Sequence, residues 1–188
     1  MLAKIEDEKQ RAFAHYLPMR EGVVLFCAGG GRDTEKLANE VASRALQMGG
    51  VRRGKLMAAG NEAAFRMFVD VFYPEIKKFK RSFLRDSQSG VEFEGILLAG
   101  SPHLEVIDKH GNTRYVFLHA AEWESDDLKA YLELLAVVIE RKYGASASDL
   151  WCMDLKTGET IAFKGSKRIR KRCVDAAHHF ARFMSAPE

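Results

Sequence analysis

The sequence predicts a mixed β-sheet flanked by helices, a fold of the α/β (α+β) class, in a single domain of 188 residues. Helical periodicity alternates along the chain with short stretches of period-two apolar residues, and glycine or polar turns separate the two patterns. One long amphipathic stretch joins two of the predicted strands, which is typical of a helix that crosses over one face of a sheet.

The N-terminal part, residues 1–54, predicts a helix, a strand and a second helix. A helix is expected over residues 2–17, and the apolar run VVLFCA after Gly22 predicts a buried strand. Helical spacing resumes at Asp33-Thr34, where a helix can be capped, and Gly49-Gly50 is expected to end this helix.

The loop CAGGGRDT between this strand and this helix is a candidate phosphate site. Glycines let a backbone approach a phosphate, and the amino terminus of a helix favours anions. However, the segment from Gly29 to Thr34 lacks the third glycine of the Gly-x-Gly-x-x-Gly fingerprint, and the chain lacks a Gly-Lys-Ser/Thr motif. A flexible turn is therefore the simpler interpretation.

A third helix and a series of strands follow. The helix begins near Asn61, and Pro74 is expected to kink or break it near Tyr73. Its apolar stripe consists of Phe65, Phe68, Phe72, Ile76 and Phe79. The remaining expected elements are strands over residues 83–86, 91–99, 104–108 and 113–119, a helix from Ser125 to Gly144, a hairpin of strands 150–155 and 160–163, and a last helix from Ser166.

Composition excludes several classes of protein. Apolar residues make up 47% and charged residues 29% of the chain, as in ordinary globular domains. No window of about 20 apolar residues occurs, so neither a membrane span nor a membrane partner is expected. The first residues lack the apolar stretch of a secretory signal. Three scattered cysteines without a Cys-x-x-Cys pair argue against a disulfide framework, so a soluble intracellular protein is expected.

The net charge of +3 is unevenly distributed along the chain. Basic residues gather in the C-terminal segment and, more briefly, over residues 77–81. Clustered basic charge is typical of a nucleic-acid surface, and a solvated helix face is the alternative. The candidate phosphate contacts of the C-terminal segment are Lys164, Lys167, Arg168, Lys171, Arg172 and Arg182.

Common zinc and nucleophile motifs are missing from the sequence. No histidine belongs to a His-x-x-x-His pair, and His178 and His179 are neighbours that point in different directions on a helix. The chain also has no Gly-x-Ser-x-Gly elbow. Cys27 follows a predicted strand and could be a reactive thiol, although a buried structural cysteine is the simpler interpretation.

The segment from residue 55 to 185 carries a family resemblance. The strand GVEFEGILLAG leads into Ser101-Pro102-His103-Leu104, a turn and the strand RYVFLHAA follow, and a helix and the hairpin DLWCMDLKTGETIAF complete the order. The segment GNEAA precedes this meander. This layout resembles the PD-(D/E)XK nuclease superfamily, in particular its RecB-like exonuclease branch. The resemblance implies a restriction-endonuclease-like fold, with residues 55–188 as the core and residues 1–54 as an addition.

The resemblance also implies where a catalytic site would lie. In this family two carboxylates hold a divalent cation, and a lysine supplies positive charge near the attacked phosphate. The strands align His103 with the first acid, Leu118 with the second acid and Ala120 with the lysine, and Glu62 with the glutamate of the preceding helix. Leucine cannot ligate Mg²⁺ and alanine carries no charge, so the motif is degenerate, and neither a metal nor another cofactor is expected.

Three functions remain open from the sequence. The first is a catalytically inactive nuclease-like protein that binds nucleic acid, or serves a structural role, with a protein partner in a nucleoprotein or repair assembly. The second is an active Mg²⁺-dependent DNA exonuclease whose acids have moved to Glu94 and Glu105 beside Glu62, although alternating glutamates are most often a solvent-facing row. The third is a protein-interaction module without a nucleic-acid role.

Overall fold

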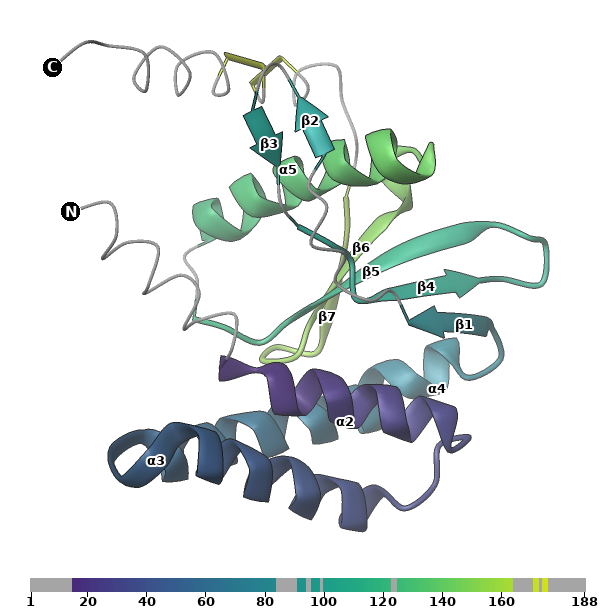
Figure 1. The fold of residues 1–188 in the computed structure, drawn as a ribbon. Helices are drawn as coiled ribbons and strands as arrows, with labels where there is room; N and C mark the ends of the chain where they lie inside the picture. The colour runs from purple at the N-terminus through teal and green to yellow at the C-terminus, as the bar shows by residue number, and fades with distance from the viewer. Residues whose placement is uncertain are drawn as a thin grey trace, which may run out of the picture. The chain divides into compact units, whose positions relative to one another are not determined.

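The computed structural model describes residues 15–83, 91–93, 96–98, 100–122, 125–163, 171–172 and 174–175. It contains helices and a mixed five-stranded sheet, so the predicted α+β class is confirmed at this level (Figure 1). The chain forms two compact units. The helical unit comprises the residues up to 79 with 118–122 and 153–159, and the sheet unit comprises 80–117, 123–152 and the residues from 160 onward.

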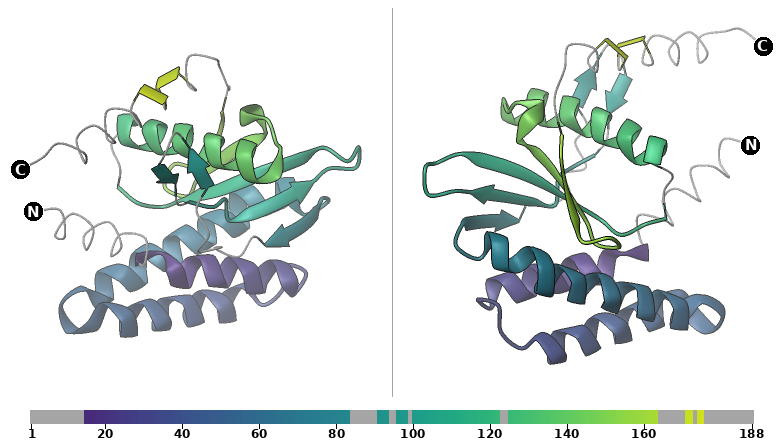
Figure 2. Two further views of the ribbon diagram at one scale, coloured as in Figure 1. Left: turned by 45° about the horizontal axis from the view of Figure 1, so that its top comes forward. Right: turned by 180° about the vertical axis from the view of Figure 1, so that it is seen from behind.

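The helical unit is built from α2 (Leu17–Ala28), α3 (Thr34–Met67), the π-helix η1 (Phe68–Phe72) and α4 (Tyr73–Ile76). Gly50 leaves helical geometry with φ 59°, and this divides α3 into two arms. The arms fold back along each other with α2 beside them, as both views of Figure 2 show. The predicted helix end at Gly49-Gly50 is therefore confirmed, and the expected boundary after residue 54 falls inside α3.

The predicted strand after Gly22 is wrong, because this segment belongs to helix α2. Its buried residues are Pro18, Met19, Gly22, Val23, Phe26 and Cys27, which recur at helical spacing, whereas Leu25 is 51% exposed. A short apolar run does not by itself distinguish a strand from a buried helix. The sequence signal that favours a helix is Pro18, since proline is common in the first turn.

The aromatic stripe of the third predicted helix forms the core of the helical unit. Phe65, Phe68, Phe72 and Ile76 are fully buried, as predicted, and Phe79 is partly buried. The expected interruption near Tyr73 takes the form of the π-helical turn η1, after which α4 continues through Pro74. Asp33 occupies the position before α3 but makes no side-chain capping hydrogen bond there, so this part of the prediction is wrong.

The described residues of the sheet unit form most of the strands and one long helix. The elements are β1 (Lys80–Phe83), β2 (Val91–Phe93), β3 (Ile96–Leu98), β4 (Leu104–Ile107), β5 (Thr113–His119), α5 (Ser125–Tyr143), the 3-10 helix η2 (Ala147–Asp149), β6 (Leu150–Asp154) and β7 (Glu159–Ala162). The main sheet has the order β1-β4-β5-β6-β7. The strands β1 and β5 are both antiparallel to β4, with Glu105 opposite Ser82 and Tyr115. The predicted hairpins 104–119 and 150–163 are confirmed.

The expected single strand over residues 91–99 is wrong. Strands β2 and β3 instead form a separate antiparallel ladder, in which Val91 pairs with Leu98 and Phe93 pairs with Ile96. The sequence signal for this interruption is Gly95, because a glycine weakens the interior of a strand.

Helix α5 packs over strands β5 and β6 (Figure 1). Leu128, Leu132, Leu135 and Ile139, the predicted core positions, are all buried in one cluster with Tyr115 and Phe117 of β5. Gly144 adopts φ 65° directly after the helix, which confirms the predicted stop.

Some predicted elements fall largely outside the described residues. These are the first helix up to residue 14, the turn SQSG and the C-terminal helix, of which only residues 171–172 and 174–175 are described, as helical. Within the described part of the chain, no helix is both long and apolar enough to cross a membrane.

Candidate functional site

The positions that align with the family acid and lysine are apolar and buried. Leu118 ends the apolar part of β5 and Ala120 follows the strand, and each is only 4% exposed. His119 between them is equally buried, and its backbone carbonyl accepts a hydrogen bond of 2.7 Å from the Leu155 amide. Neither Leu118 nor Ala120 offers an electron pair or a charge, so these two positions do not fit a divalent cation.

Glu62 already has a cationic partner. It lies on the second arm of α3, and its carboxylate accepts a hydrogen bond of 3.0 Å from Arg66 one turn later. Arg66 also reaches Glu35 through two contacts of 2.7 and 2.9 Å. These contacts raise the pKa of Arg66 above its ordinary value and lower the pKa of Glu35. Glu62 therefore belongs to an ion-pair network within the helical unit.

His103 is held in the sheet unit. Its ring lies 4.8 Å from the Phe117 ring, and its backbone amide donates a hydrogen bond of 2.7 Å to the Val116 carbonyl. The other three aligned residues, Glu62, Leu118 and Ala120, belong to the helical unit. Because it packs against an aromatic ring, His103 has a structural role beside β4 and β5 and does not replace a metal-binding carboxylate.

Glu105 is the candidate for a relocated acid that the structure describes, since Glu94 lies outside the described residues. It is half-buried on β4, opposite Tyr115. Burial is the main cause that raises the pKa of Tyr115, and the charge of Glu105 raises it further. Burial and Glu105 also raise the pKa of Tyr143, whereas a hydrogen bond with Ser101 lowers it. Among the described residues, no three His, Cys, Asp or Glu side chains are arranged to hold a metal ion.

The glycine loop terminates helix α2. The Gly31 amide donates to the Phe26 carbonyl at 2.9 Å and the Gly30 amide to the Cys27 carbonyl at 3.1 Å, while Gly30 adopts φ 72°. This is the Schellman pattern of a helix C-terminus. A Cβ at Gly31 would lie 2.4 Å from the Tyr73 hydroxyl, so the loop also packs against the end of η1. The strand-loop-helix context of a phosphate site is absent at this loop, and its amides serve the helix end instead.

His119 is a buried titratable residue that motif reasoning did not single out. Burial is the main cause that lowers its pKa, Lys156 lowers it further, and Asp154 acts in the opposite direction. Asp154 accepts the Lys156 amide at 2.9 Å in the turn between β6 and β7, and the Lys156 ammonium group contacts Glu122 at 3.3 Å. His119 therefore lies beside a small polar cluster within the helical unit.

Asn61, next to Glu62, is a second residue that sequence reasoning missed. It is completely buried. Its carbonyl oxygen accepts a hydrogen bond of 3.0 Å from the Met19 amide, and its side-chain nitrogen donates to the carbonyls of His15 at 2.8 Å and Met57 at 2.9 Å. The Asn61 side chain thus fixes the start of α2 to the second arm of α3. The sequence signal was an asparagine on the same face as Phe65 and Phe68.

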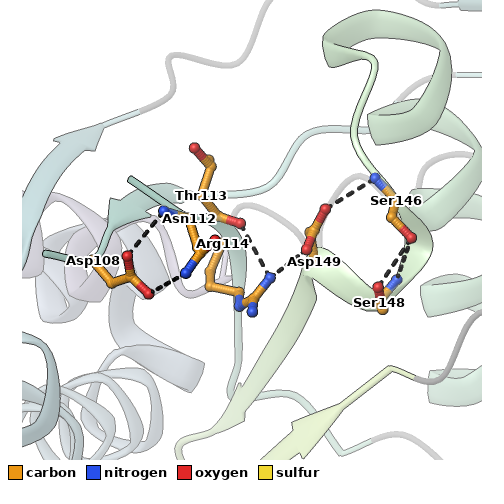
Figure 3. Close-up of polar contacts among 7 residues, drawn as sticks. All are labelled: Asp108, Asn112, Thr113, Arg114, Ser146, Ser148 and Asp149. Atoms are coloured by element: carbon orange, nitrogen blue, oxygen red, sulfur yellow. Dashed lines mark hydrogen bonds and ion pairs between the residues drawn. The ribbon is translucent and has the colours of Figure 1, made fainter. Parts of the chain in front are cut away.

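A polar network joins β5 to η2 in the sheet unit (Figure 3). Arg114 forms an ion pair with Asp149, and its guanidinium lies 5.7 Å from the Trp151 ring. Asp149 and Ser146 form a capping box, in which the Ser146 amide donates to Asp149 at 3.0 Å. The network holds the connection after α5 in place and has the character of structural support rather than of a reactive site.

The candidate phosphate contacts are only partly described. Lys171 and Arg172 are exposed, and Arg172 forms an ion pair with Glu133 of α5. Lys164, Lys167, Arg168 and Arg182 lie outside the described residues. In the shorter basic run, Lys77 and Lys78 are exposed in the helical unit.

Comparison with family models, with curated proteins and with solved structures finds no match for this chain. Its function is therefore argued from the residues and contacts above.

Proposed function

We propose that this chain is a catalytically silent protein of the PD-(D/E)XK type that binds nucleic acid as one subunit of a nucleoprotein assembly. The observation that carries the first part is the pair Leu118 and Ala120, each 4% exposed, at the positions of the family acid and lysine. A buried carboxylate or ammonium group without a partner would cost several kcal/mol, whereas these two side chains contribute to the core.

The order of the elements supports the proposed scaffold. The strands β1, β4 and β5 form an antiparallel meander, α5 follows, and the hairpin β6–β7 completes the sheet beside β5. The resemblance implies this succession of meander, helix and hairpin. Glu62 and His103 also support a lack of catalytic activity, because Glu62 is paired with Arg66 and His103 packs on Phe117.

The nucleic-acid role is supported by the distribution of charge. The net charge is +3, and the C-terminal segment is rich in lysine and arginine. Contacts from such residues to phosphates are independent of base sequence and weaken steeply with salt. Arg172 contributes less in this proposal, since Glu133 already neutralises its charge.

The first test is a cleavage assay with single- and double-stranded DNA and RNA in Mg²⁺ or Mn²⁺. We expect no cleavage. Metal-dependent cutting that disappears in Glu62→Ala or Glu105→Ala would contradict the proposal and favour an active exonuclease with relocated acids.

The second test is filter binding of the same nucleic acids across a salt series. We expect an affinity whose logarithm falls linearly with the logarithm of salt concentration. An absence of binding at low salt would instead favour a protein-interaction module, and the phosphate-binding part of the proposal would fail.

A further inference from the structure

The turn between the two arms of α3 forms a tight tip, which we define as residues 46–56. The chain reverses at Gly50, and the arms run back along each other in both views of Figure 2. A Cβ at Gly49 would lie 2.6 Å from the Gly54 Cα atom, so the two arms meet here through their backbones. A Cβ at Gly54 would lie 2.5 Å from the Leu46 carbonyl oxygen. These close approaches fix the geometry of the hairpin tip.

Positive charge gathers on the hairpin tip. Arg52, Arg53 and Lys55 are all exposed, and none of them forms an ion pair with another described residue. The sequence has no aspartate or glutamate from Val41 to Gly60. The field of this cluster reaches a neighbouring residue, because the charge of Arg53, after burial, is the second cause that lowers the pKa of His15.

Apolar side chains stand beside these cations. Val51 at the apex is fully exposed at 104%, and Leu56 on the second arm is 75% exposed. Leu46 and Met48 on the first arm are 45% and 49% exposed. Four of the large apolar side chains exposed on the described chain therefore lie on this one tip.

We propose that the hairpin tip contacts a nucleic-acid duplex, with its arginines and lysine on the phosphates and Val51 directed at the minor groove. This inference rests on the proposed nucleic-acid role and names a surface distinct from the C-terminal basic segment. Charge complementarity identifies the partner, since three exposed cations with no ion-pair partner among the described residues attract a polyanion. Proteins that bind the minor groove combine basic side chains with an apolar wedge, which is the combination found here.

Two other occupants fit the hairpin tip less well. A second copy of the chain that docked tip to tip would bring the same three positive charges together, and residues 41–60 contain no acid to receive them. An anionic bilayer surface is usually bound by segments with tryptophan or phenylalanine beside leucine, and the hairpin tip has no aromatic residue. A duplex requires only the cations and a small apolar apex.

The test measures the fluorescence anisotropy of a labelled DNA duplex of about 20 base pairs at several salt concentrations. The variant is Arg52→Glu with Arg53→Glu. The matched control is Lys109→Glu with Lys129→Glu, which changes the net charge equally at two exposed positions of the sheet unit. Exposed substitutions of this kind leave stability nearly unchanged, which thermal unfolding checks.

We expect the tip variant to weaken binding about tenfold at low salt and to lower the slope of log affinity against log salt by about 2, since two phosphate contacts are lost. We expect the control to stay within about twofold of the unchanged protein. Val51→Ser with Leu56→Ser should weaken binding without changing the slope.

The outcomes distinguish a failure of this inference from a failure of the proposed nucleic-acid function. Equal binding by the tip variant and the control overturns the role of the hairpin tip and leaves the proposed function intact. Absence of duplex binding by the unchanged protein overturns both. Binding of phosphatidylserine vesicles that requires Arg52 and Arg53, without duplex binding, identifies a bilayer as the partner instead and also overturns the inference.

Discussion

At the scale of single residues, the positions that the resemblance aligns with a catalytic motif have neighbours with structural roles. Asn61 uses both its carbonyl and its amino group to join two helices, although it is adjacent to the aligned Glu62. His119 is buried between Leu118 and Ala120, two aligned positions whose side chains carry no charge.

The Asn61→Leu substitution tests the helix connection. It keeps the size of the side chain but leaves the buried Met19 amide without its partner, so we expect the free energy of unfolding to fall by about 2–3 kcal/mol. Urea unfolding followed by circular dichroism measures the change. The matched control is Asn39→Leu at an exposed position of α3, which should change stability by less than about 0.5 kcal/mol. Equal effects of both substitutions would contradict the role of Asn61.

The His119→Gln substitution tests the buried imidazole through pH. Burial lowers the pKa of His119 below its ordinary 6.5, so the unfolded chain binds a proton more readily than the folded protein does. This residue contributes its full stabilisation above about pH 6.5, and the contribution is lost as the pH falls through the lowered value. We therefore expect stability to decline less steeply below about pH 6.5 in His119→Gln.

Urea unfolding at a series of pH values measures this slope. His110→Gln, at an exposed turn position, serves as the control variant. A slope for His119→Gln that matches the unchanged protein would show that His119 does not control the acid sensitivity.

At the scale of elements, glycines decide how closely the helices of the helical unit approach. An added Cβ at Gly22 of α2 would lie 2.3 Å from a methyl group of Val41 and 3.3 Å from the Phe65 ring. At Gly60 of α3 the nearest atom would be the Tyr16 hydroxyl at 3.6 Å, an ordinary contact distance. The first glycine is required by packing, and the second only lowers helix propensity.

Alanine at these two positions should therefore have opposite effects. We expect Gly22→Ala to lower the free energy of unfolding by about 1–3 kcal/mol through overpacking. We expect Gly60→Ala to raise it by about 0.5–1 kcal/mol, because alanine favours the helix and restricts the unfolded chain. Thermal and urea unfolding of the two variants side by side measure the difference. A loss of stability in Gly60→Ala, or none in Gly22→Ala, would refute this account of the α2–α3 contact.

At the scale of the whole molecule, the proposed lack of catalytic activity implies that divalent cations do not change the stability of the protein. A ligand at about 100 times its dissociation constant stabilises a folded protein by about 2.7 kcal/mol, so a working metal site would raise the melting temperature visibly. The aligned positions offer Leu118, Ala120 and a paired Glu62 to such an ion.

We therefore expect the melting temperature in about 10 mM Mg²⁺ or Mn²⁺ to equal the melting temperature in sodium chloride of the same ionic strength. Differential scanning calorimetry makes the comparison. A metal-specific rise that disappears in Glu105→Ala would reveal a relocated site and contradict the silent scaffold.

Much of the sheet unit could be predicted from the sequence, because its signals are local. The β4–β5 hairpin, α5 and the β6–β7 hairpin have clear periodicity, and turn residues such as Gly144 mark where they end. The apolar identity of Leu118 and Ala120 was equally visible, since a residue type needs no coordinates. These features follow from side-chain spacing and turn chemistry, which depend on residues close together in the sequence.

Other features depended on contacts between distant residues. The apolar run VVLFCA fits a strand or a buried helix, and its packing in α2, where the Phe26 ring lies 5.8 Å from the Phe65 ring, is a tertiary contact. The glycine loop is a helix end because its amides meet the carbonyls of Phe26 and Cys27.

The sequence by itself determined the period of each well-marked element and which side chains could carry charge. Tertiary structure alone decided that Asn61 joins two helices, that Arg66 pairs with Glu35 and that the cationic tip at Gly50 is exposed. The physical reason is that burial and hydrogen-bond partners are properties of pairs of residues far apart in the chain, and a local pattern contains no information on such pairs.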